Sequence, residues 1–369
     1  MVPFNDLRPR YADQHADLDA AIRRVLARGR FVLGPELECF EQEFADYHGG
    51  GHAVGVASGT DAIELALRAA GIGLGDEVVT VSHTAVATVC GIERAGATPV
   101  FADIDPVSCT MAADAADAAV TPRTRALVAV HLYGHPANLP ALFAMARRHG
   151  LLLIEDCAQA HGAKLSGWLV GTWGDLAAFS FCPAKNLGAL GDGGAVLVRD
   201  PVLAGRLRRL RNHGQAERCH HAERGINSRL DEIQAAILRI QLAGLDAHGA
   251  ERRRLAALYS ELLPDMGQPR CWPGPDRVKH ANHRYVIRHP RRDALRQRLR
   301  SAGVETLVHY PVPVHLQPAY ADLDYVRGSL PATERAAAEV LSLPLYVGLR
   351  DSQVHRVADA VRAARKEAA

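Results

Sequence analysis

The stretch Leu151-Leu152-Leu153-Ile154-Glu155-Asp156 indicates the fold of this 369-residue chain. A short, continuous apolar run that ends in acidic residues is typical of a strand buried on both faces of a parallel sheet. Ligands of such sheets bind in the crevice at the carboxyl ends of the strands, so Asp156 is predicted to face a binding site. Residues 175–181 predict a second buried strand, which leads to Lys185 and the glycine-rich residues 188–194. The proline and the glycines on either side of Lys185 place this lysine on a turn.

An aspartate and a lysine at the ends of neighbouring strands suit the cofactor pyridoxal 5'-phosphate (PLP). The lysine forms a Schiff base with this cofactor, and the aspartate keeps the pyridine nitrogen protonated so that the ring can accept electrons. A plainer interpretation also fits, in which Asp156 caps a helix that starts near Cys157 and Lys185 is an ordinary surface lysine. Spacing alone leaves both interpretations open.

Strands and helices alternate through the first part of the chain. Predicted strands cover residues 52–57, 76–81, 98–103 and 125–130, and predicted helices cover residues 62–70, 84–94 and 139–149. This alternation favours a mostly parallel sheet with helices on both faces. Before the first strand, we expect a helix with Leu18, Ile22, Val25 and Leu26 on one face, a break at Gly34-Pro35 and a second helix.

The sequence Ser58-Gly59-Thr60-Asp61 follows the first predicted strand and begins a helix. A helix N-terminus offers free backbone N–H groups and the positive end of the helix dipole, which together bind phosphate. Ser58 and Asp61 also have the spacing of a capping box, so a well-capped helix explains the same residues. Both interpretations stay open on spacing alone.

Composition sets broad limits on the class of protein. With 369 residues and 48% hydrophobic content, the chain is predicted to form two domains, residues 1–245 and 246–369. A net charge of +2 favours neither a nucleic acid nor a membrane as partner. The N-terminus lacks a secretion signal and no segment is long enough to span a bilayer, so we expect a cytoplasmic protein. The seven cysteines include no Cys-x-x-Cys pair, which indicates neither a disulfide framework nor a metal site.

The second part of the chain has a different character. Residues 215–223 are predicted to be a polar loop, and Ser228 is predicted to cap the helix that follows. From about residue 245, long helical patterns, a proline-rich crossing at residues 264–275 and a strand at residues 284–288 predict a smaller domain. Prolines stiffen residues 309–318, so His309, Tyr310 and His315 are predicted to project from a rigid loop. A surface loop with solvated imidazoles is the alternative.

Several segments together resemble the sugar aminotransferases of the DegT/DnrJ/EryC1/StrS family, and their order and spacing match throughout. The segments are Glu155-Asp156-Cys157-Ala158-Gln159-Ala160-His161-Gly162-Ala163, Gly174-Asp175, Phe179-Ser180-Phe181, Lys185-Asn186-Leu187-Gly188-Ala189 and Gly191-Asp192-Gly193-Gly194. With Leu341-Ser342-Leu343-Pro344-Leu345, the similarity covers nearly the whole chain. It implies the α/β fold of a fold-type I PLP-dependent transferase, similar to aspartate aminotransferase. Such a fold has a large domain built on a mostly parallel sheet and a smaller α+β C-terminal domain.

The resemblance also assigns roles to individual residues. It implies that Lys185 forms the Schiff base with PLP, that Asp156 pairs with the pyridine nitrogen, and that Gln159 lies by the ring hydroxyl. The expected phosphate-binding residues are Ser58, Gly59, Thr60 and Ser180, together with Asn227, which in the family reaches across a dimer interface to the PLP phosphate of the partner subunit. Arg229, in the same segment as Asn227, is assigned to the substrate.

One position departs from the family. Many relatives have an aromatic residue after the Thr of the Ser-x-Thr segment, where it stacks on the cofactor ring, whereas this chain has Ala85. His83, two positions earlier, is therefore a candidate for the stacking role. A satisfied loop histidine is the alternative.

The resemblance implies a homodimeric enzyme that transfers an amino group from L-glutamate to a nucleotide-linked keto sugar. Relatives that act on 3-keto sugars carry a segment similar to the loop at residues 309–318, so we assign His309, Tyr310 and His315 to the substrate. We therefore expect a 3-amino sugar nucleotide made from a dTDP-linked 3-keto-6-deoxyhexose. A 4-keto sugar nucleotide or a cyclitol is an alternative substrate. A sugar dehydratase, in which histidine replaces the lysine, and a non-catalytic regulatory protein are the competing functions.

Overall fold

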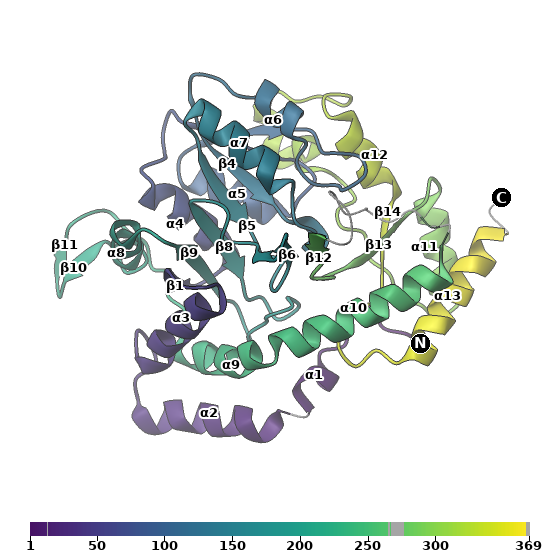
Figure 1. The fold of residues 1–369 in the computed structure, drawn as a ribbon, viewed down its shortest axis with the longest axis horizontal. Helices are drawn as coiled ribbons and strands as arrows, with labels where there is room; N and C mark the ends of the chain where they lie inside the picture. The colour runs from purple at the N-terminus through teal and green to yellow at the C-terminus, as the bar shows by residue number, and fades with distance from the viewer. Residues whose placement is uncertain (13, 265, 267–276, 367–369) are drawn as a thin grey trace.

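A computed structural model describes residues 1–12, 14–264, 266 and 277–366 of the chain (Figure 1). Most of the proline-rich crossing predicted at residues 264–275 lies outside the described residues, and so does Cys271. Within the described residues, none of the helices combines the length and the apolar character that crossing a bilayer requires.

The helices have the following bounds: α1 (Arg8–Ala12), α2 (His15–Arg28), α3 (Pro35–Tyr47), α4 (Gly59–Ala69), α5 (Val86–Arg94), α6 (Ala113–Ala118), α7 (Leu139–His149), α8 (Pro201–Leu210), α9 (Glu232–Ala243), α10 (Leu245–Leu262), α11 (Arg292–Ser301), α12 (Pro331–Glu339) and α13 (Asp351–Lys366). Short 3-10 helices lie at η1 (Leu132–Gly134), η3 (Val314–Leu316) and η4 (Pro318–Leu323). The strands are β1 (His52–Val56), β2 (Glu77–Val81), β3 (Thr98–Ala102), β4 (Thr124–Val130), β5 (Leu152–Asp156), β6 (Lys164–Leu165), β7 (Trp168–Leu169), β8 (Leu176–Ser180), β9 (Gly194–Val198), β10 (Gln215–Glu217), β11 (His220–His221), β12 (Val278–Lys279), β13 (Tyr285–Arg288) and β14 (Val340–Leu343).

The central sheet of the described residues has seven strands in the order β1-β9-β8-β5-β4-β2-β3. β9 pairs antiparallel with both β1 and β8, and the other pairings are parallel. The strands and helices predicted from the alternating pattern are therefore confirmed, with ends that shift by at most three residues. The sheet is mostly parallel, as expected.

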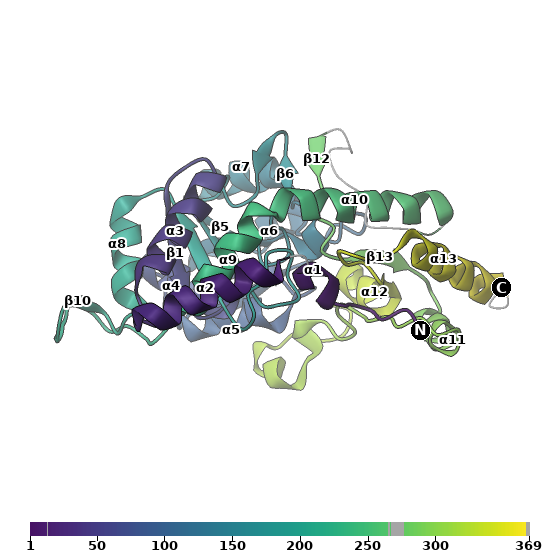
Figure 2. The same cartoon turned by 90° about the horizontal axis from the view of Figure 1, so that it is seen from below.

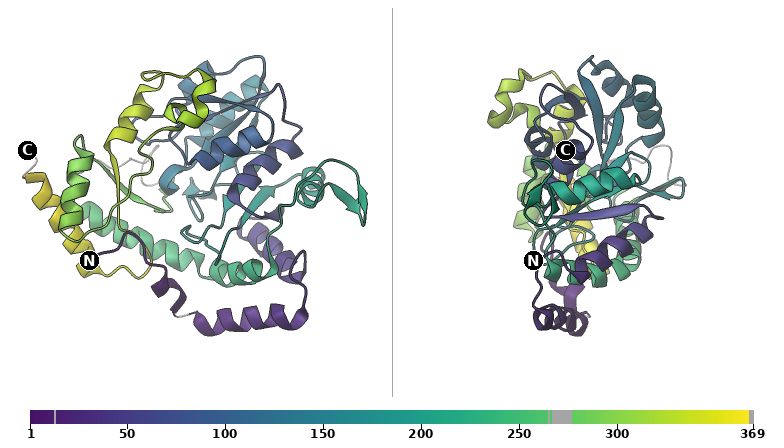
Figure 3. Two further views of the ribbon diagram at one scale, coloured as in Figure 1. Left: turned by 180° about the vertical axis from the view of Figure 1, so that it is seen from behind. Right: turned by 90° about the vertical axis from the view of Figure 1, so that its left-hand side faces the viewer.

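Both faces of the sheet are buried because neighbouring residues of a strand point to opposite sides. Leu127 and Leu153 belong to one hydrophobic core, which includes apolar residues of α3 and α7. Val128 and Ile154, the next residue on each strand, belong to a second core with residues of α4, α5 and α8. Helices accordingly lie on both sides of the sheet (Figure 3). This arrangement explains why residues 151–154 are apolar without alternation.

A third core lies in the C-terminal part of the chain, where α10, α11 and α13 pack against β13 and β14. The N-terminal residue Val2 is buried in this core and forms a parallel bridge with Val304. Figure 1 shows α10 running from the sheet toward this part of the molecule, with the N-terminus close by. The first residues of the chain thus pack against its last third.

Three local predictions were wrong. Within the predicted polar loop at residues 215–223, residues 215–221 form the β10–β11 hairpin, which projects from the body beyond α8 (Figure 2). Ser228 does not cap α9, because that helix begins at Glu232. The Ser228 hydroxyl instead donates a 2.7 Å hydrogen bond to the Asp61 carboxylate. Leu26 is 56% exposed, so it does not share the buried face of α2 with Leu18.

Glu232 links α9 to α3. Its carboxylate accepts hydrogen bonds from the backbone N–H groups of Gly34 (3.0 Å), Glu36 (3.0 Å) and Leu37 (2.9 Å). These groups belong to the first turn of α3, where no backbone carbonyl is available within the helix. A carboxylate at a helix N-terminus is also favoured by the helix dipole. The side chain of α9 therefore caps α3 from almost 200 residues away in the sequence.

Replacing Glu232 by Gln should destabilise the protein by about 2 kcal/mol, because a neutral amide accepts fewer and weaker hydrogen bonds from these N–H groups. Denaturant unfolding followed by circular dichroism measures this change. Glu38→Gln is the matched control, since Glu38 lies in the same helical turn but is exposed. Equal stability losses in the two variants would contradict the capping role.

Candidate functional site

The candidate active site lies at the carboxyl edge of the parallel strands. Ser58 follows β1, His83 follows β2 and Tyr133 follows β4, while Asp156 and Ser180 are the last residues of β5 and β8. Because β5 and β8 are parallel neighbours, with Asp156 opposite Ala178, their ends meet at one place. This edge is where α/β sheets bind ligands.

Asp156 is buried and has two hydrogen-bond donors. Thr88 of α5 donates to Oδ2 at 2.8 Å, and the backbone N–H of Ala158 donates to Oδ1 at 3.1 Å. The hydroxyls of Thr84 and Thr88 lie 2.9 Å apart, and since the Thr88 proton points to Asp156, Thr84 is the donor of this pair. The two threonines thus fix the orientation of the carboxylate. Sequence reasoning missed both, although their i, i+4 spacing at the start of a helix beside the sheet edge was a usable signal.

Lys185 lies on the turn after β8, as predicted. The backbone N–H of Lys185 donates to the carbonyl of Cys182 at 2.8 Å, and the guanidinium of Arg10 donates to the backbone carbonyl of Lys185 at 2.9 Å. Burial lowers the pKa of the Lys185 amine to about 8; Asp156 opposes this shift and Arg284 reinforces it. The amine therefore changes its charge close to neutral pH, which suits a group that must act both as a nucleophile and as a base.

The N-terminus of α4 and the end of β8 form a cradle. Ser58 caps α4 by accepting a 3.1 Å hydrogen bond from the N–H of Asp61, as the capping-box spacing predicted. Gly59 packs so closely against Ser180 that a Cβ at Gly59 would lie 2.5 Å from the Ser180 Cβ. The glycine thereby keeps the helix N-terminus, the partly buried Thr60 and the Ser180 hydroxyl together. Backbone N–H groups and hydroxyls at a helix N-terminus are what a phosphate requires.

Gln159 and Tyr310 connect the sheet edge to the loop at residues 309–318. The Gln159 amide accepts from the backbone N–H of Tyr133 at 2.8 Å and donates to the Tyr310 hydroxyl at 3.2 Å. The Tyr133 hydroxyl donates to the backbone carbonyl of His309. Tyr310 and His309 are therefore brought to the same edge as Asp156, although the sequence separates them by more than 150 residues.

Burial gives the two loop side chains unusual acid–base properties. It raises the pKa of the Tyr310 hydroxyl to about 12, although Arg284 opposes the shift. Burial also lowers the pKa of His309 to about 3, and Arg284 and Lys185 reinforce the effect. Both side chains are uncharged at neutral pH and serve as neutral hydrogen-bonding groups.

His83 is fully buried and donates from Nε2 to the Tyr133 hydroxyl at 2.9 Å. Burial lowers the pKa of His83 to about 4, so the imidazole is neutral. Its Nδ1 is buried and has no hydrogen-bond partner among the described residues. An orphaned acceptor at the sheet edge is consistent with a ligand or water beside it. The structure places His83 at the site, in edge contact with Tyr133 (ring centroids 6.1 Å apart).

His315 lies in a different environment from the rest of its loop. It is buried, with Nδ1 2.7 Å from the Ser82 hydroxyl and Nε2 3.3 Å from a Glu334 carboxylate oxygen. Both ring nitrogens are thus occupied by protein groups. The imidazole fastens the loop to the residue that precedes His83, and in this arrangement neither nitrogen is free for a substrate hydroxyl.

Asn227 and Arg229 lie at the border of the site. Asn227 is exposed, and between them Ser228 accepts the N–H of Ala57 at 3.0 Å, next to the cradle. Arg229 is partly buried and donates to the side chain of Asn212 at 3.1 Å. Ser228 is therefore bonded next to the cradle of its own chain, whereas the neighbouring Asn227 is exposed on the surface.

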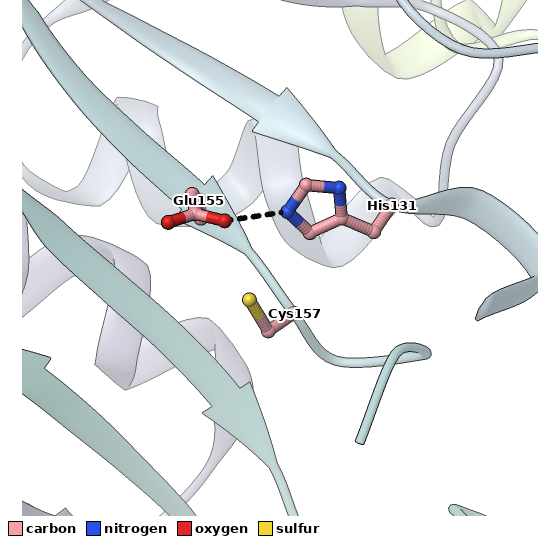
Figure 4. Close-up of side chains that lie close together, drawn as sticks. All are labelled: His131, Glu155 and Cys157. Atoms are coloured by element: carbon pink, nitrogen blue, oxygen red, sulfur yellow. Dashed lines mark hydrogen bonds and ion pairs between the residues drawn. The ribbon is translucent and has the colours of Figure 1, made fainter. Parts of the chain in front are cut away.

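Three potential metal ligands, His131, Glu155 and Cys157, lie together on the opposite face of β5 from Asp156 (Figure 4). His131 accepts the N–H of Ala137 at Nδ1, so Nε2 carries the proton and donates to Glu155 at 3.0 Å. Both imidazole nitrogens are then used within the protein. Burial raises the pKa of the Cys157 thiol well above its usual value, so the thiolate that a metal needs is disfavoured. Hydrogen bonding explains this cluster without an ion.

The arrangement fits PLP. The cradle offers phosphate donors, Asp156 offers an oriented carboxylate for a protonated ring nitrogen, and Lys185 offers an amine on the adjacent strand end. These are the groups that hold the cofactor in enzymes of this kind.

Comparisons with known proteins show which family the chain resembles. Residues 12–362 match the DegT/DnrJ/EryC1/StrS aminotransferase family. The chain is 53% identical over 364 residues to the dTDP-3-amino-3,4,6-trideoxy-alpha-D-glucose transaminase of Streptomyces venezuelae, covering 98% of this chain and 95% of that protein. It is 51% identical over 361 residues to the erythromycin biosynthesis sensory transduction protein EryC1 of Saccharopolyspora erythraea, covering 97% and 98%. The crystal structure of S. venezuelae DesV in complex with a ketimine intermediate superposes with a TM-score of 0.95 at 51% identity, covering 98% of each chain.

Identity of this extent along the whole chain, together with the shared fold, confirms the fold-type I architecture and the enzymatic nature of the protein. The chain therefore belongs to the DegT/DnrJ/EryC1/StrS aminotransferase family and is a PLP-dependent sugar aminotransferase.

Proposed function

We propose that the enzyme transfers an amino group from L-glutamate to carbon 3 of a dTDP-linked 3-keto-6-deoxyhexose, which gives a 3-amino sugar nucleotide. The observation that carries this proposal is the position of His309 and Tyr310, which are hydrogen bonded into the cofactor edge through Tyr133 and Gln159. The Streptomyces venezuelae relative, whose name describes a 3-amino dTDP sugar, supports the same carbon and nucleotide.

We assign the cofactor contacts as follows. Asp156 pairs with the pyridine nitrogen, Gln159 lies by the ring hydroxyl, and His83 lies beside the ring. The phosphate is bound by Ser58, Gly59, Thr60 and Ser180. When bound, PLP supplies an electron sink for the carbanion formed on the reacting carbon. The chain itself supplies orientation and proton transfer.

Lys185 would hold the cofactor through its amine and, as a free amine, would move a proton to and from the reacting carbon of the donor. A pKa of about 8 supports this role, because the amine is readily available as a free base near neutral pH. Transamination needs this proton to move twice in opposite directions. A residue whose charge changes near the working pH can do both.

On the substrate side, we assign Tyr310 and His309 to direct contact with the sugar, since both are neutral hydrogen-bonding groups at the site. The sequence pattern assigned His315 to the substrate as well; with its nitrogens on Ser82 and Glu334, we propose that it acts through the loop that it holds. Arg229 is assigned to the nucleotide side of the substrate.

Two competing functions lose support. A dehydratase of this fold has histidine in place of the lysine, and this chain has Lys185. The EryC1 relative carries the name of a sensory transduction protein, but a purely regulatory protein has no need of the Thr84–Thr88–Asp156 arrangement beside a lysine. A 4-keto sugar nucleotide or a cyclitol remains the competing substrate.

We further propose a homodimer in which Asn227 completes the phosphate site of the partner subunit. Val86 and Leu190 are 48% and 45% exposed beside the cofactor edge, and a second copy would cover them. The β10–β11 hairpin, just before Asn227, projects from the body and offers an arm for such a contact (Figures 1 and 2).

We also propose the division into a large domain, residues 1–245, and a small domain, residues 246–369, with α10 as the connection. The separate core around α10, α11 and α13 supports this division, although Val2 belongs to the same core. For the location, we propose the cytoplasm. Free cysteines such as Cys39, Cys90 and Cys182 are typical of a reducing compartment.

The position of the new amino group can be determined directly. Incubation of the enzyme with 15N-labelled L-glutamate and a dTDP-linked 3-keto-6-deoxyhexose should place the label on carbon 3, as read by NMR spectroscopy of the product. Lys185→Ala should give no product, which controls for uncatalysed amination. Label on carbon 4 from the 4-keto isomer, with the 3-keto sugar untouched, would overturn the proposed substrate but not the enzyme class.

Thr88→Val should weaken PLP binding on the order of tenfold, because a hydrogen bond to a charged, buried Asp156 contributes about 1.5–3 kcal/mol. Titration of the purified protein with PLP, followed by absorbance, measures the affinity. Thr88→Ser should restore it. Thr80→Val is the matched control: Thr80 is a buried threonine that donates to the Val128 carbonyl, so its loss should not change PLP affinity. Equal effects of Thr88→Val and Thr80→Val would contradict the role of Thr88.

The cross-subunit role of Asn227 can be separated from a role within one chain by mixing variants. A heterodimer of Lys185→Ala and Asn227→Ala subunits should retain PLP at the one intact lysine as tightly as the wild type, because the Lys185→Ala subunit contributes its Asn227 to that site. The amount of PLP that stays bound to the protein after gel filtration measures this retention. If Asn227 acts within its own chain, the heterodimer will lose PLP as readily as the Asn227→Ala homodimer, on the order of tenfold faster than the wild type.

A further inference from the structure

The amino-donor half of the reaction requires a group that the cofactor contacts do not supply. An amino acid carries its α-carboxylate one bond from the carbon that bears the amino group. When that carbon lies against Lys185, the carboxylate must lie within a few ångströms of the lysine. A buried carboxylate needs a cationic partner, and a guanidinium binds it best because two parallel N–H groups match its two oxygens.

Arg284 is held at this position by the backbone on either side of it. Asn186, the neighbour of Lys185, donates to the carbonyl of Ala281 at 2.8 Å, and His283 Nδ1 lies 3.4 Å from the Asn186 side-chain oxygen. The backbone N–H of Arg284 donates to the carbonyl of Tyr133 at 3.3 Å. The segment that carries Arg284 is therefore fastened to the lysine turn and to the end of β4.

The side chain of Arg284 is positioned but has no anionic partner. Its guanidinium carbon lies 5.1 Å from the centre of the Phe4 ring, and that ring lies 5.7 Å from the His309 ring. Nε is buried without a hydrogen bond, and within the described part of the chain the side chain forms neither an ion pair nor a hydrogen bond. Burial lowers the pKa of Arg284 to about 10, so the group stays charged at neutral pH.

Two neighbouring arginines are held by hydrogen bonds within the protein. Arg10 donates from Nε to Gln241 and from Nη1 to the Lys185 carbonyl, although its Nη2 is buried without a partner, and Arg229 donates to Asn212. A charge that is largely removed from water without a counterion is unfavourable, so a site that keeps one is prepared for an anionic ligand.

We propose that Arg284 binds the α-carboxylate of the amino-acid donor and thereby selects the donor. The inference rests on the proposed use of an amino acid such as L-glutamate. The sugar nucleotide also carries an anion, its diphosphate, but that group is attached to carbon 1 and lies several bonds from the carbon that reacts beside Lys185. The neutral sugar ring that replaces the donor in the second half-reaction needs no cation at this position.

Arg284→Gln tests the assignment. The variant should weaken the binding of glutarate, an unreactive dicarboxylate, on the order of 30- to 100-fold in titration calorimetry of the purified protein. In single-turnover experiments, the L-glutamate half-reaction should need a similarly higher donor concentration, whereas the concentration dependence of the keto-sugar half-reaction should change by no more than about threefold. Arg284→Lys should give an intermediate loss, because an ammonium keeps the charge but not the paired N–H groups.

Arg253→Gln is the matched control, since it removes a partly buried arginine from the same part of the chain and should leave glutarate binding unchanged. Circular dichroism of both Arg284 variants checks their folding, and Arg284→Lys keeps the proposal testable if Arg284→Gln does not fold. Unchanged glutarate binding with a weakened keto-sugar half-reaction would assign Arg284 to the diphosphate and overturn the proposal, and so would equal losses in both half-reactions. A wild-type enzyme that binds glutarate but aminates no 3-keto sugar would contradict the proposed sugar alone.

Discussion

The buried carboxylate of Glu155 is the interaction on which the site depends. It accepts hydrogen bonds from His131 and from the backbone N–H groups of Gly171, Trp173 and Gly174, at 2.7–3.0 Å. Burial opposes its ionisation, but the hydrogen bond from His131 and the backbone donors outweigh burial and lower the pKa of Glu155. The carboxylate thus fixes the end of β5 between two loops. Because neighbouring strand residues face opposite sides, this fixation also sets the direction of Asp156.

Much of the cofactor side could be predicted from the sequence because its determinants are local. Apolar runs, the turn around Lys185 and the alternation of strands and helices are features of short segments, and the geometry of parallel strands then brings Asp156 and Lys185 together. The reversed direction of β9 could not be predicted in the same way. Its apolar residues are buried whichever way the strand runs, so the sequence pattern carries no information on direction.

The remaining errors and omissions concern side chains whose partners are distant in the sequence. Ser228 has the residue type of a helix cap, yet its hydrogen-bond partner is Asp61, 167 residues earlier. Thr88 lies in an apolar helix and has no evident role in the sequence, but the fold brings its hydroxyl to the Asp156 carboxylate. His315 was predicted to project from its loop, but the loop folds back so that the imidazole is buried against Ser82. In each case the sequence identifies a polar side chain, but its hydrogen-bond partner is determined by the fold.

The contact between the N-terminus and the C-terminal part of the chain has a consequence for biosynthesis. The N–H of Val2 donates to the carbonyl of Gly303, and the N–H of Phe4 donates to the Glu305 carboxylate. On the ribosome, the strands of the central sheet have all been made once β9 emerges, so the cofactor edge can form early. Residues such as Phe4 cannot form their native hydrogen bonds until their partners, about 300 residues later in the chain, have been synthesised. The side of the site that contains Phe4 and Arg284 is therefore completed last, on a sheet that is already in place.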